Sequence, residues 1–198
     1  LIWVKNSLSP QEVRDKIREN KTFAEEYTAW LESCHQGGYS TGTDVEIATV
    51  VEQLSQNPTE SIPVPPPSDM TDADAESWLN EVRRITDCIV HLSNRHNSRH
   101  DKGCLRGNAP NTYCRANFPR MLYPQTLVDW VTGSVQLRHT DQWMNTFNIV
   151  LTYLIRCNTD VTCLMSSTQV RAIIAYVTDY VTKNSLKTHA VFETIKAV

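Results

Sequence analysis

Residues 167–183 have the sequence STQVRAIIAYVTDYVTK, in which apolar residues and tyrosines recur at helical spacing. The apolar positions fall at steps of three and four and predict one stripe on a helix: Val170, Ile173, Ile174 and Val177. Tyr176 and Tyr180 are four residues apart and share a helical face, with Lys183 one turn later. A tyrosine oxygen can attack a phosphodiester while a lysine stabilises the phosphate charge, so this face is a candidate phosphoryl-transfer site. Periodicity alone favours the alternative, an amphipathic helix that only half-buries its tyrosine rings.

The composition fits an ordinary globular chain of 198 residues with a formal net charge of -3. No long apolar run is present, so a membrane span is not expected. Nucleic-acid-binding proteins are often basic overall, and such a role would therefore need a local basic patch in this chain. The chain begins at Leu1 rather than at methionine, which we interpret as the start of a fragment of a longer protein.

Local signals predict helices, short strands and one linker. Ser9, Pro10 and Glu12 form a helix-start signature, and further amphipathic stretches follow. The expected helices are 10–20, 44–56, 71–94 and 186–197, with one more that runs through Phe23 and Leu31 and ends near Gly37. The expected strands are 1–4, 158–164 and a hairpin over 127–137 with Gly133 in its turn, while 149–155 fits either a helix or a buried strand.

These elements predict an α+β fold in which helices, including 167–183, pack on a small antiparallel sheet. Residues 57–70 contain five prolines and are expected to be an extended linker. The expected organisation is a strand-plus-helix segment over 1–56, the linker over 57–70, a helix and Cys/His segment over 71–120, and a C-terminal part over 121–198 that carries the tyrosine helix.

A candidate metal site has the spacing His96-x3-His100-x3-Cys104-x9-Cys114. Two imidazoles and two thiolates are a ligand set for a closed, structural zinc site, and the surrounding loop has little core of its own. The six cysteines do not resemble the framework of a small disulfide-rich secreted domain, which favours zinc in a reducing compartment. Cys88 and His91 are substitute ligands, and a solvated loop with free cysteines is the alternative interpretation.

Basic residues surround these four ligands. They are Arg95, Arg99, Lys102, Arg106, Arg115 and Arg120. A nucleic-acid backbone is the natural partner for such a patch, with Tyr113 and Phe118 available to stack on bases. A run of charges is also typical of an ordinary solvated face.

Four motifs together resemble the Rep-type region of Helitron rolling-circle transposases of fungal type. They are CRANFPR (114–120), WMNTFN (143–148), RCNTD (156–160) and AYVTDYVTK (175–183). The resemblance implies a HUH endonuclease fold, in which a His-hydrophobic-His pair on a strand binds a divalent cation, magnesium or manganese. It further implies that Tyr176 or Tyr180 attacks single-stranded DNA and becomes linked to its 5′ end, with Lys183 closing the motif. A helicase domain in the same parent chain and a location in the nucleus follow from the same resemblance.

The chain departs from this family pattern in three ways. It contains no His-hydrophobic-His pair, which relatives carry just before a strand resembling Leu1–Val4, so the pair is expected upstream of Leu1. Ile149 follows Asn148 where the family usually has proline, and a Gly-x4-Gly-Lys phosphate loop is missing. The fragment alone is therefore not expected to cleave DNA efficiently. Two alternatives remain open: a zinc-stabilised module that binds nucleic acid without catalysis, and a decayed mobile-element domain.

Overall fold

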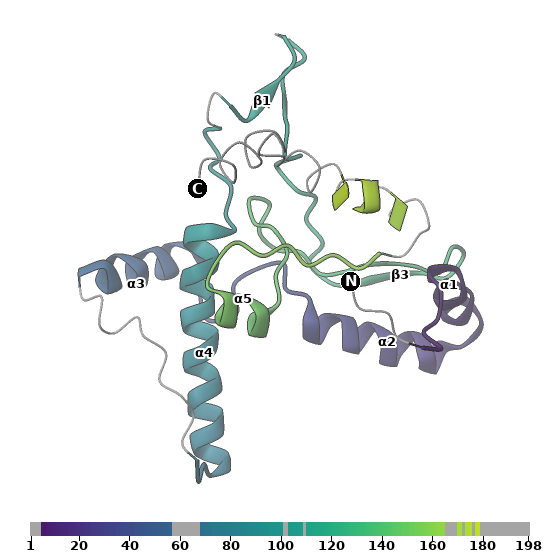
Figure 1. Ribbon diagram of the computed structural model, residues 1–198, viewed down its shortest axis with the longest axis horizontal. Coiled ribbons are helices and arrows are strands. Elements are labelled where there is room, and N and C mark those ends of the chain that lie inside the picture. Colours follow the sequence, from purple (N-terminus) through teal and green to yellow (C-terminus); the bar gives the residue numbers. More distant parts are fainter. Residues whose placement is uncertain are drawn as a thin grey trace, which may run out of the picture.

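The computed structural model describes residues 5–56, 68–100, 103–108, 110–164 and 170–178, the last range without 172 and 176. The named helices are α1 (Pro10–Glu19), α2 (Lys21–Cys34), α3 (Asp44–Gln56), α4 (Asp72–Ser93) and α5 (Ile149–Ile155). Two separate antiparallel hairpins pair β1 (Leu105–Arg106) with β2 (Tyr113–Cys114) and β3 (Leu127–Asp129) with β4 (Ser134–Gln136). Helices combined with small antiparallel sheets confirm the predicted α+β class (Figure 1).

Helices α1 and α2 begin where their capping residues predict. The hydroxyl of Ser9 accepts a hydrogen bond from the N–H of Glu12, and the Glu12 carboxylate accepts one from the N–H of Ser9, at 3.3 and 2.7 Å. Pro10 is the first helical residue, where a backbone N–H has no intrahelical partner to lose. Asn20 ends α1 and caps α2 with its side chain. These local interactions set the boundary between the two helices.

A small core lies between α1, α2 and the β3–β4 hairpin. Val13 and Ile17 of α1 are buried with Ala24 of α2, and Val128 and Val135 pack against them from the hairpin. Val128 and Val135 are direct cross-strand partners, so their side chains project from the same face. The predicted hairpin over 127–137 is therefore confirmed, and its apolar face is what holds it to the two helices.

Gly133 in the turn of this hairpin allows close packing on α1. Its φ is +70°, in the left-handed region that glycine adopts without strain. A Cβ at this position would lie 2.2 Å from the carbonyl oxygen of Arg14. The backbone of the turn therefore approaches the backbone of α1 more closely than any other residue type would permit.

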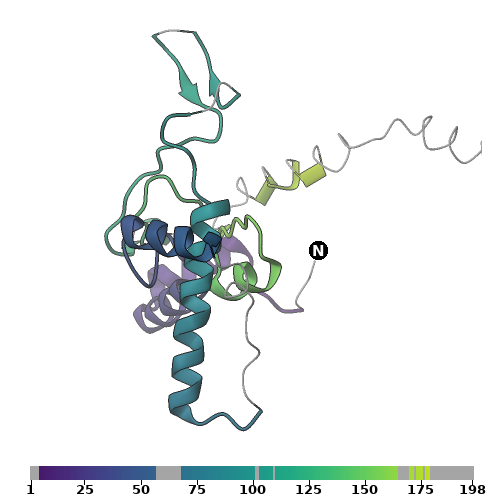
Figure 2. The ribbon, with the colours of Figure 1, turned by 90° about the vertical axis from the view of Figure 1, so that its left-hand side faces the viewer.

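The main core is built on α4, the longest helix, with α3 and α5 packed near its C-terminal half (Figures 1 and 2). Thr71 caps this helix in a reciprocal arrangement with Asp74, as its acidic first turn predicts. Val90 is fully buried against Met144 and Phe147, which come from the segment before α5. The segment that leads into α5 is thereby fixed to the end of α4.

Asp87 on α4 anchors the loop that precedes α3. Its side chain is fully buried and accepts hydrogen bonds from the backbone N–H and hydroxyl groups of Ser40 and Thr41, at 2.7 to 3.2 Å. Burial raises the pKa of Asp87, and the hydrogen bonds from Thr41 and Ser40 oppose that rise. A carboxylate surrounded by donors is therefore the group that this position requires.

We expect Asp87→Asn to lower the free energy of unfolding by about 3 kcal/mol, because the new amide would direct N–H groups at donors that now have an acceptor. Urea unfolding of the full chain followed by circular dichroism measures this change. Asp69→Asn, at an exposed position before α4, is the matched control and should change it by less than about 0.5 kcal/mol. Equal effects of the two substitutions would contradict the anchoring role.

The strand predicted over residues 158–164 is wrong. The Asn94 side chain bonds both the N–H and the carbonyl oxygen of Thr159, at 3.1 and 2.5 Å. Val161 donates its N–H to the carbonyl oxygen of Thr146 and accepts from the hydroxyl of Thr146, at 3.1 and 2.6 Å. Asn94 and Thr146 thus bond backbone groups that a strand would use for pairing. Residues far away in the sequence therefore determine that this segment is not a strand.

Residues 149–155, left open between helix and strand, form α5. Asn148 caps this helix by accepting the N–H of Leu151, and Arg156 ends it in the left-handed conformation with φ +59°. Only Thr152 of α5 is buried, so most of this apolar segment is exposed. The described residues of 170–178 are also helical, which confirms that part of the predicted helix.

The apolar stripe of this C-terminal helix is not packed on a sheet as expected. Ile173, Ile174 and Val177 are all exposed. The predicted strand 1–4, the linker residues 57–67 and the helix 186–197 lie outside the described residues. Among the residues that the structure describes, no helix combines the length and apolar character needed to span a membrane.

Candidate metal centre and nucleic-acid interface

The first two candidate ligands follow the end of α4. Arg95 forms a β-bridge with Met144, and the N–H of His96 donates to the carbonyl oxygen of Trp143 at 2.6 Å. His96 is thereby fixed to the segment that packs in the main core. His100 has a φ of +52°, a left-handed conformation that is found in tight turns. The spacing of four residues places the two imidazoles side by side through this turn.

The two cysteines are brought together by the β1–β2 hairpin. Cys104 immediately precedes β1, and the strand register pairs its neighbour Leu105 with Cys114. The N–H of Arg115 also donates to the carbonyl oxygen of Cys104 at 2.8 Å. Strand pairing thus makes neighbours of two thiols that are ten residues apart in the sequence. The hairpin projects away from the helices in both views (Figures 1 and 2).

The four predicted ligands form one cluster. The Cys104 Sγ lies 3.2 Å from His96 Nε2, 3.5 Å from His100 Nδ1 and 3.2 Å from Cys114 Sγ. His96 Nε2 lies 3.1 Å from His100 Nδ1 and 3.6 Å from Cys114 Sγ. One ligand atom from each residue lies within 4.8 Å of all the others, and both cysteines are free of disulfides. The set is able to hold a metal ion.

Backbone groups favour a thiolate at one position of the cluster. Burial by itself raises the pKa of Cys114, but hydrogen bonds from the backbone of Phe118, from Cys104 and from the backbone of Ala116 outweigh it and lower the pKa. The hydrogen bond with Cys114 is the main cause that raises the pKa of Cys104. Asn117, with φ +57°, turns the chain so that it wraps around Cys114. Such a turn stabilises the negatively charged form that binds a metal.

Aromatic rings enclose the cluster on one side. His96 stacks on Phe118 with ring centroids 4.5 Å apart and an interplanar angle of 4°, and Trp143 lies near both imidazoles, with centroids 6.5 Å from His96 and 5.7 Å from His100. Phe118 is only 6% exposed, so it supports the imidazole and is not available to stack on a base, contrary to the expectation. Sequence reasoning missed the supporting role of Trp143, because its only signal was membership of the WMNTFN motif.

The predicted basic patch divides into exposed and internally bonded residues. Arg99, Arg106 and Arg115 are exposed around the cluster, whereas Lys102 lies outside the described residues. Arg95 instead bonds Asp44 and Asp141 at 2.9 and 3.2 Å. Arg120 donates to Asn145 at 3.0 Å, and its guanidinium lies 4.6 Å from the ring centroid of Phe118. The exposed face is therefore smaller than the sequence indicates.

The substitute ligands are not part of the cluster. Cys88 is buried in the core, and burial raises the pKa of its thiol. The Nδ1 of His91 lies 2.9 Å from the hydroxyl of Tyr39 and 3.4 Å from a carboxylate oxygen of Asp44. His91 thus holds the end of α4 to Tyr39 and Asp44, and Cys88 is a buried core residue.

The predicted catalytic residues Tyr176, Tyr180 and Lys183 all lie outside the described residues. Comparisons with protein-family models, with curated proteins and with solved structures find no match to this chain. The metal cluster and its exposed arginines are thus the features of the described residues on which a function can be built.

Proposed function

We propose that this chain contains a zinc-stabilised module that binds single-stranded DNA. The observation that carries the proposal is the convergence of two imidazoles and two thiols on one point, with exposed arginines on the projecting hairpin and on the turn before it. Zinc is the metal that best suits this borderline-soft donor set.

The distances within the cluster support tetrahedral zinc. With Zn–S near 2.3 Å and Zn–N near 2.05 Å, tetrahedral geometry places ligand atoms about 3.4 Å apart for N···N, about 3.6 Å for S···N and about 3.8 Å for S···S. The corresponding distances are 3.1 Å for N···N, 3.2 to 3.6 Å for three of the four S···N pairs and 3.2 Å for S···S, and the fourth S···N pair, between Cys114 and His100, lies within 4.8 Å. These distances are close to those of a tetrahedral site, so an ion would need only a small rearrangement of the four side chains. Four protein ligands leave no open position for substrate, so this zinc is structural.

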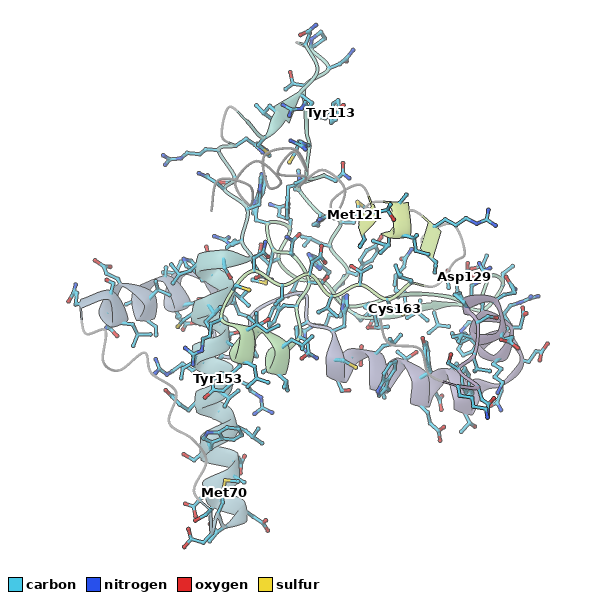
Figure 3. All side chains as sticks on the ribbon, in the orientation of Figure 1. Met70, Tyr113, Met121, Asp129, Tyr153 and Cys163 are labelled. Carbon is cyan, nitrogen blue, oxygen red and sulfur yellow. The ribbon has the colours of Figure 1, made fainter. Side chains whose placement is uncertain are left out.

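The position of the exposed arginines supports nucleic acid as the partner. Arg99 immediately precedes the His100 ligand, Arg106 ends β1 and Arg115 follows the Cys114 ligand, so a zinc ion would hold Arg106 and Arg115 on a rigid hairpin and Arg99 on the turn before it. Tyr113 on β2, labelled in Figure 3, is 61% exposed and offers a ring for base stacking. Phosphate contacts from arginine combined with base–aromatic stacking are the usual means of binding single strands without strong sequence preference.

We further propose that this module belongs to the Rep endonuclease region of a Helitron-type transposase, on the basis of the sequence motifs. Tyr176 and Tyr180 would supply the nucleophile and Lys183 would stabilise the phosphate. A His-hydrophobic-His pair elsewhere in the parent protein would hold the magnesium or manganese ion that polarises the phosphate. The zinc-stabilised hairpin would then position the strand for nicking and joining, next to a helicase domain of the same parent chain.

Replacing three arginines tests the binding function. We expect Arg99→Gln, Arg106→Gln and Arg115→Gln together to weaken binding of a single-stranded oligonucleotide about 100-fold at 0.1 M salt and to reduce the salt slope by about 2. When a phosphate contact is lost, fewer counterions are released on binding, and this lowers both the affinity and the salt slope. Fluorescence anisotropy over a range of salt concentrations measures them.

The control removes the same charge from another surface. Lys5→Gln, Arg18→Gln and Lys21→Gln change exposed residues of the N-terminal segment and should leave the affinity within about threefold of the original. If both triple variants lose the same affinity, binding reflects net charge alone and the hairpin is not the interface. Tighter binding of duplex DNA than of single strands would contradict the choice of partner.

A further inference from the structure

A cavity of about 400 Å³ is lined in part by Arg120, whose guanidinium lies over the Phe118 ring beside the metal centre. Its walls include Met121, His139, Asn145 and Asp160. Met121 and Cys163, both labelled in Figure 3, line it from segments far apart in the sequence. The volume is within the range of pockets that hold small organic groups.

His139 lines this cavity and carries a buried ring nitrogen without a hydrogen-bond partner in the described part of the chain. Its side chain is only 7% exposed, and its Nε2 has no hydrogen-bond partner among the described residues. Burial lowers the pKa of His139, so the ring is neutral near pH 7, and a hydrogen bond to the backbone of Asp141 opposes that shift. Because Nε2 has no partner, we assign the Asp141 bond to Nδ1–H, which leaves the lone pair of the neutral ring on Nε2. A buried nitrogen with a free lone pair can accept a hydrogen bond from a ligand.

The charges around the cavity favour an uncharged ligand group. Arg120 and Asp160 both line it and have opposite charges. His35 also lines it, and burial lowers the pKa of this second imidazole, whose Nδ1 likewise has no hydrogen-bond partner in the described part of the chain. A phosphate would have to lie near the Asp160 carboxylate, whereas a neutral polar ring would not be repelled.

We propose that this cavity binds one nucleobase of the single strand held by the metal-stabilised hairpin, an inference that rests on the proposed function. Every nucleobase carries at least one N–H donor that can satisfy the Nε2 of His139, and Met144 and Val135 supply apolar wall for its faces. Arg120 lines the cavity and also lies over Phe118, which supports the His96 ligand, so one arginine connects the cavity wall with the residues around the metal cluster.

A metal ion is a less suitable occupant. Within the described residues, the donor atoms of at least three metal-ligating side chains converge at the His96–Cys114 cluster. His35, His139 and Asp160 do not form a second cluster of this kind. The cavity is also large for a single ion that would be held by widely separated donors. A planar heterocycle fills such a space and meets donors and acceptors at its edges.

Mononucleotide binding to the full chain tests this assignment. We expect deoxynucleoside 5′-monophosphates to shift the ¹⁵N resonance of His139 Nε2 in a saturable manner, whereas 2-deoxyribose 5-phosphate, which lacks a base, does not. Two variants should each weaken this binding at least about tenfold. Met121→Trp fills the mouth from a side chain that is 72% exposed, so the core is not disturbed. His139→Asn keeps a donor for the Asp141 backbone and removes Nε2; for it, backbone amide shifts report the binding.

Met70→Trp, at another exposed methionine far from the cavity, is the matched control and should bind as the unchanged protein does. The base assignment would be overturned if 2-deoxyribose 5-phosphate bound as tightly as the mononucleotides. It would also be overturned if neither Met121→Trp nor His139→Asn weakened mononucleotide binding. Single-stranded DNA that binds while mononucleotides leave His139 unshifted would overturn this inference alone. Mononucleotide binding at His139 without any salt-dependent binding of single strands would support the base pocket and contradict the proposed function.

Discussion

Chelation of zinc should unfold the segment from His96 to Arg120 and leave the helical core folded. The hairpin has two strands of two residues each, and nearly all of its side chains are exposed, so ligand bonds must supply its stability. Structural zinc contributes on the order of 10 kcal/mol in small zinc-binding peptides, far more than a two-stranded hairpin gains by itself. Amide hydrogen exchange should show protection lost in β1 and β2 after chelation, while α4 and α5 keep theirs.

Elemental analysis supplies the matching measurement. Protein purified without added metal should contain about one zinc per chain. Cys104→Ser combined with Cys114→Ser should abolish this content, because a serine hydroxyl does not replace a thiolate ligand. Cys157→Ser, at an exposed cysteine outside the cluster, is the control and should retain the metal. Full zinc content in the double variant, or a hairpin that stays protected after chelation, would show that the four residues are not the ligands.

The second large effect concerns the two tyrosines. In a parent protein that carries a His-hydrophobic-His pair, single-stranded DNA and manganese or magnesium should give a covalent protein–DNA adduct. Changing Tyr176 and Tyr180 together to Phe should abolish this adduct, because Phe keeps the ring and removes only the nucleophilic oxygen. Denaturing gel electrophoresis with labelled DNA detects the adduct directly.

Tyr153→Phe is the matched control for ring chemistry. Tyr153 lies on α5 and makes an edge-on contact with Trp78, with ring centroids 6.4 Å apart. Removing the Tyr153 hydroxyl by this substitution should leave adduct formation unchanged. An adduct that persists in the double Tyr variant would place the nucleophile elsewhere and leave the binding module as the function of this chain.

The sequence alone determined the elements whose signals are local. Ser9 with Glu12 and Thr71 with Asp74 mark helix starts, because a cap is an interaction between residues three apart. The β3–β4 hairpin has its turn at Gly133, as its short-range pattern predicts. Three of the metal ligands, His96, His100 and Cys104, also follow one another at steps of four, so their grouping was visible in the sequence.

Tertiary structure decided everything that depends on distant partners. Strand pairing places Cys114 beside Cys104, and Asp44 and Asp141 withdraw Arg95 from the predicted basic face. The segment 158–164 has the composition of a strand but is bonded by the side chains of Asn94 and Thr146. His139 gives no local signal at all, because its burial and its unsatisfied nitrogen arise from segments that the fold assembles around it. Capping and turn energies act within a few residues, whereas burial and pairing depend on the whole chain, and that difference separates what could be predicted from what could not.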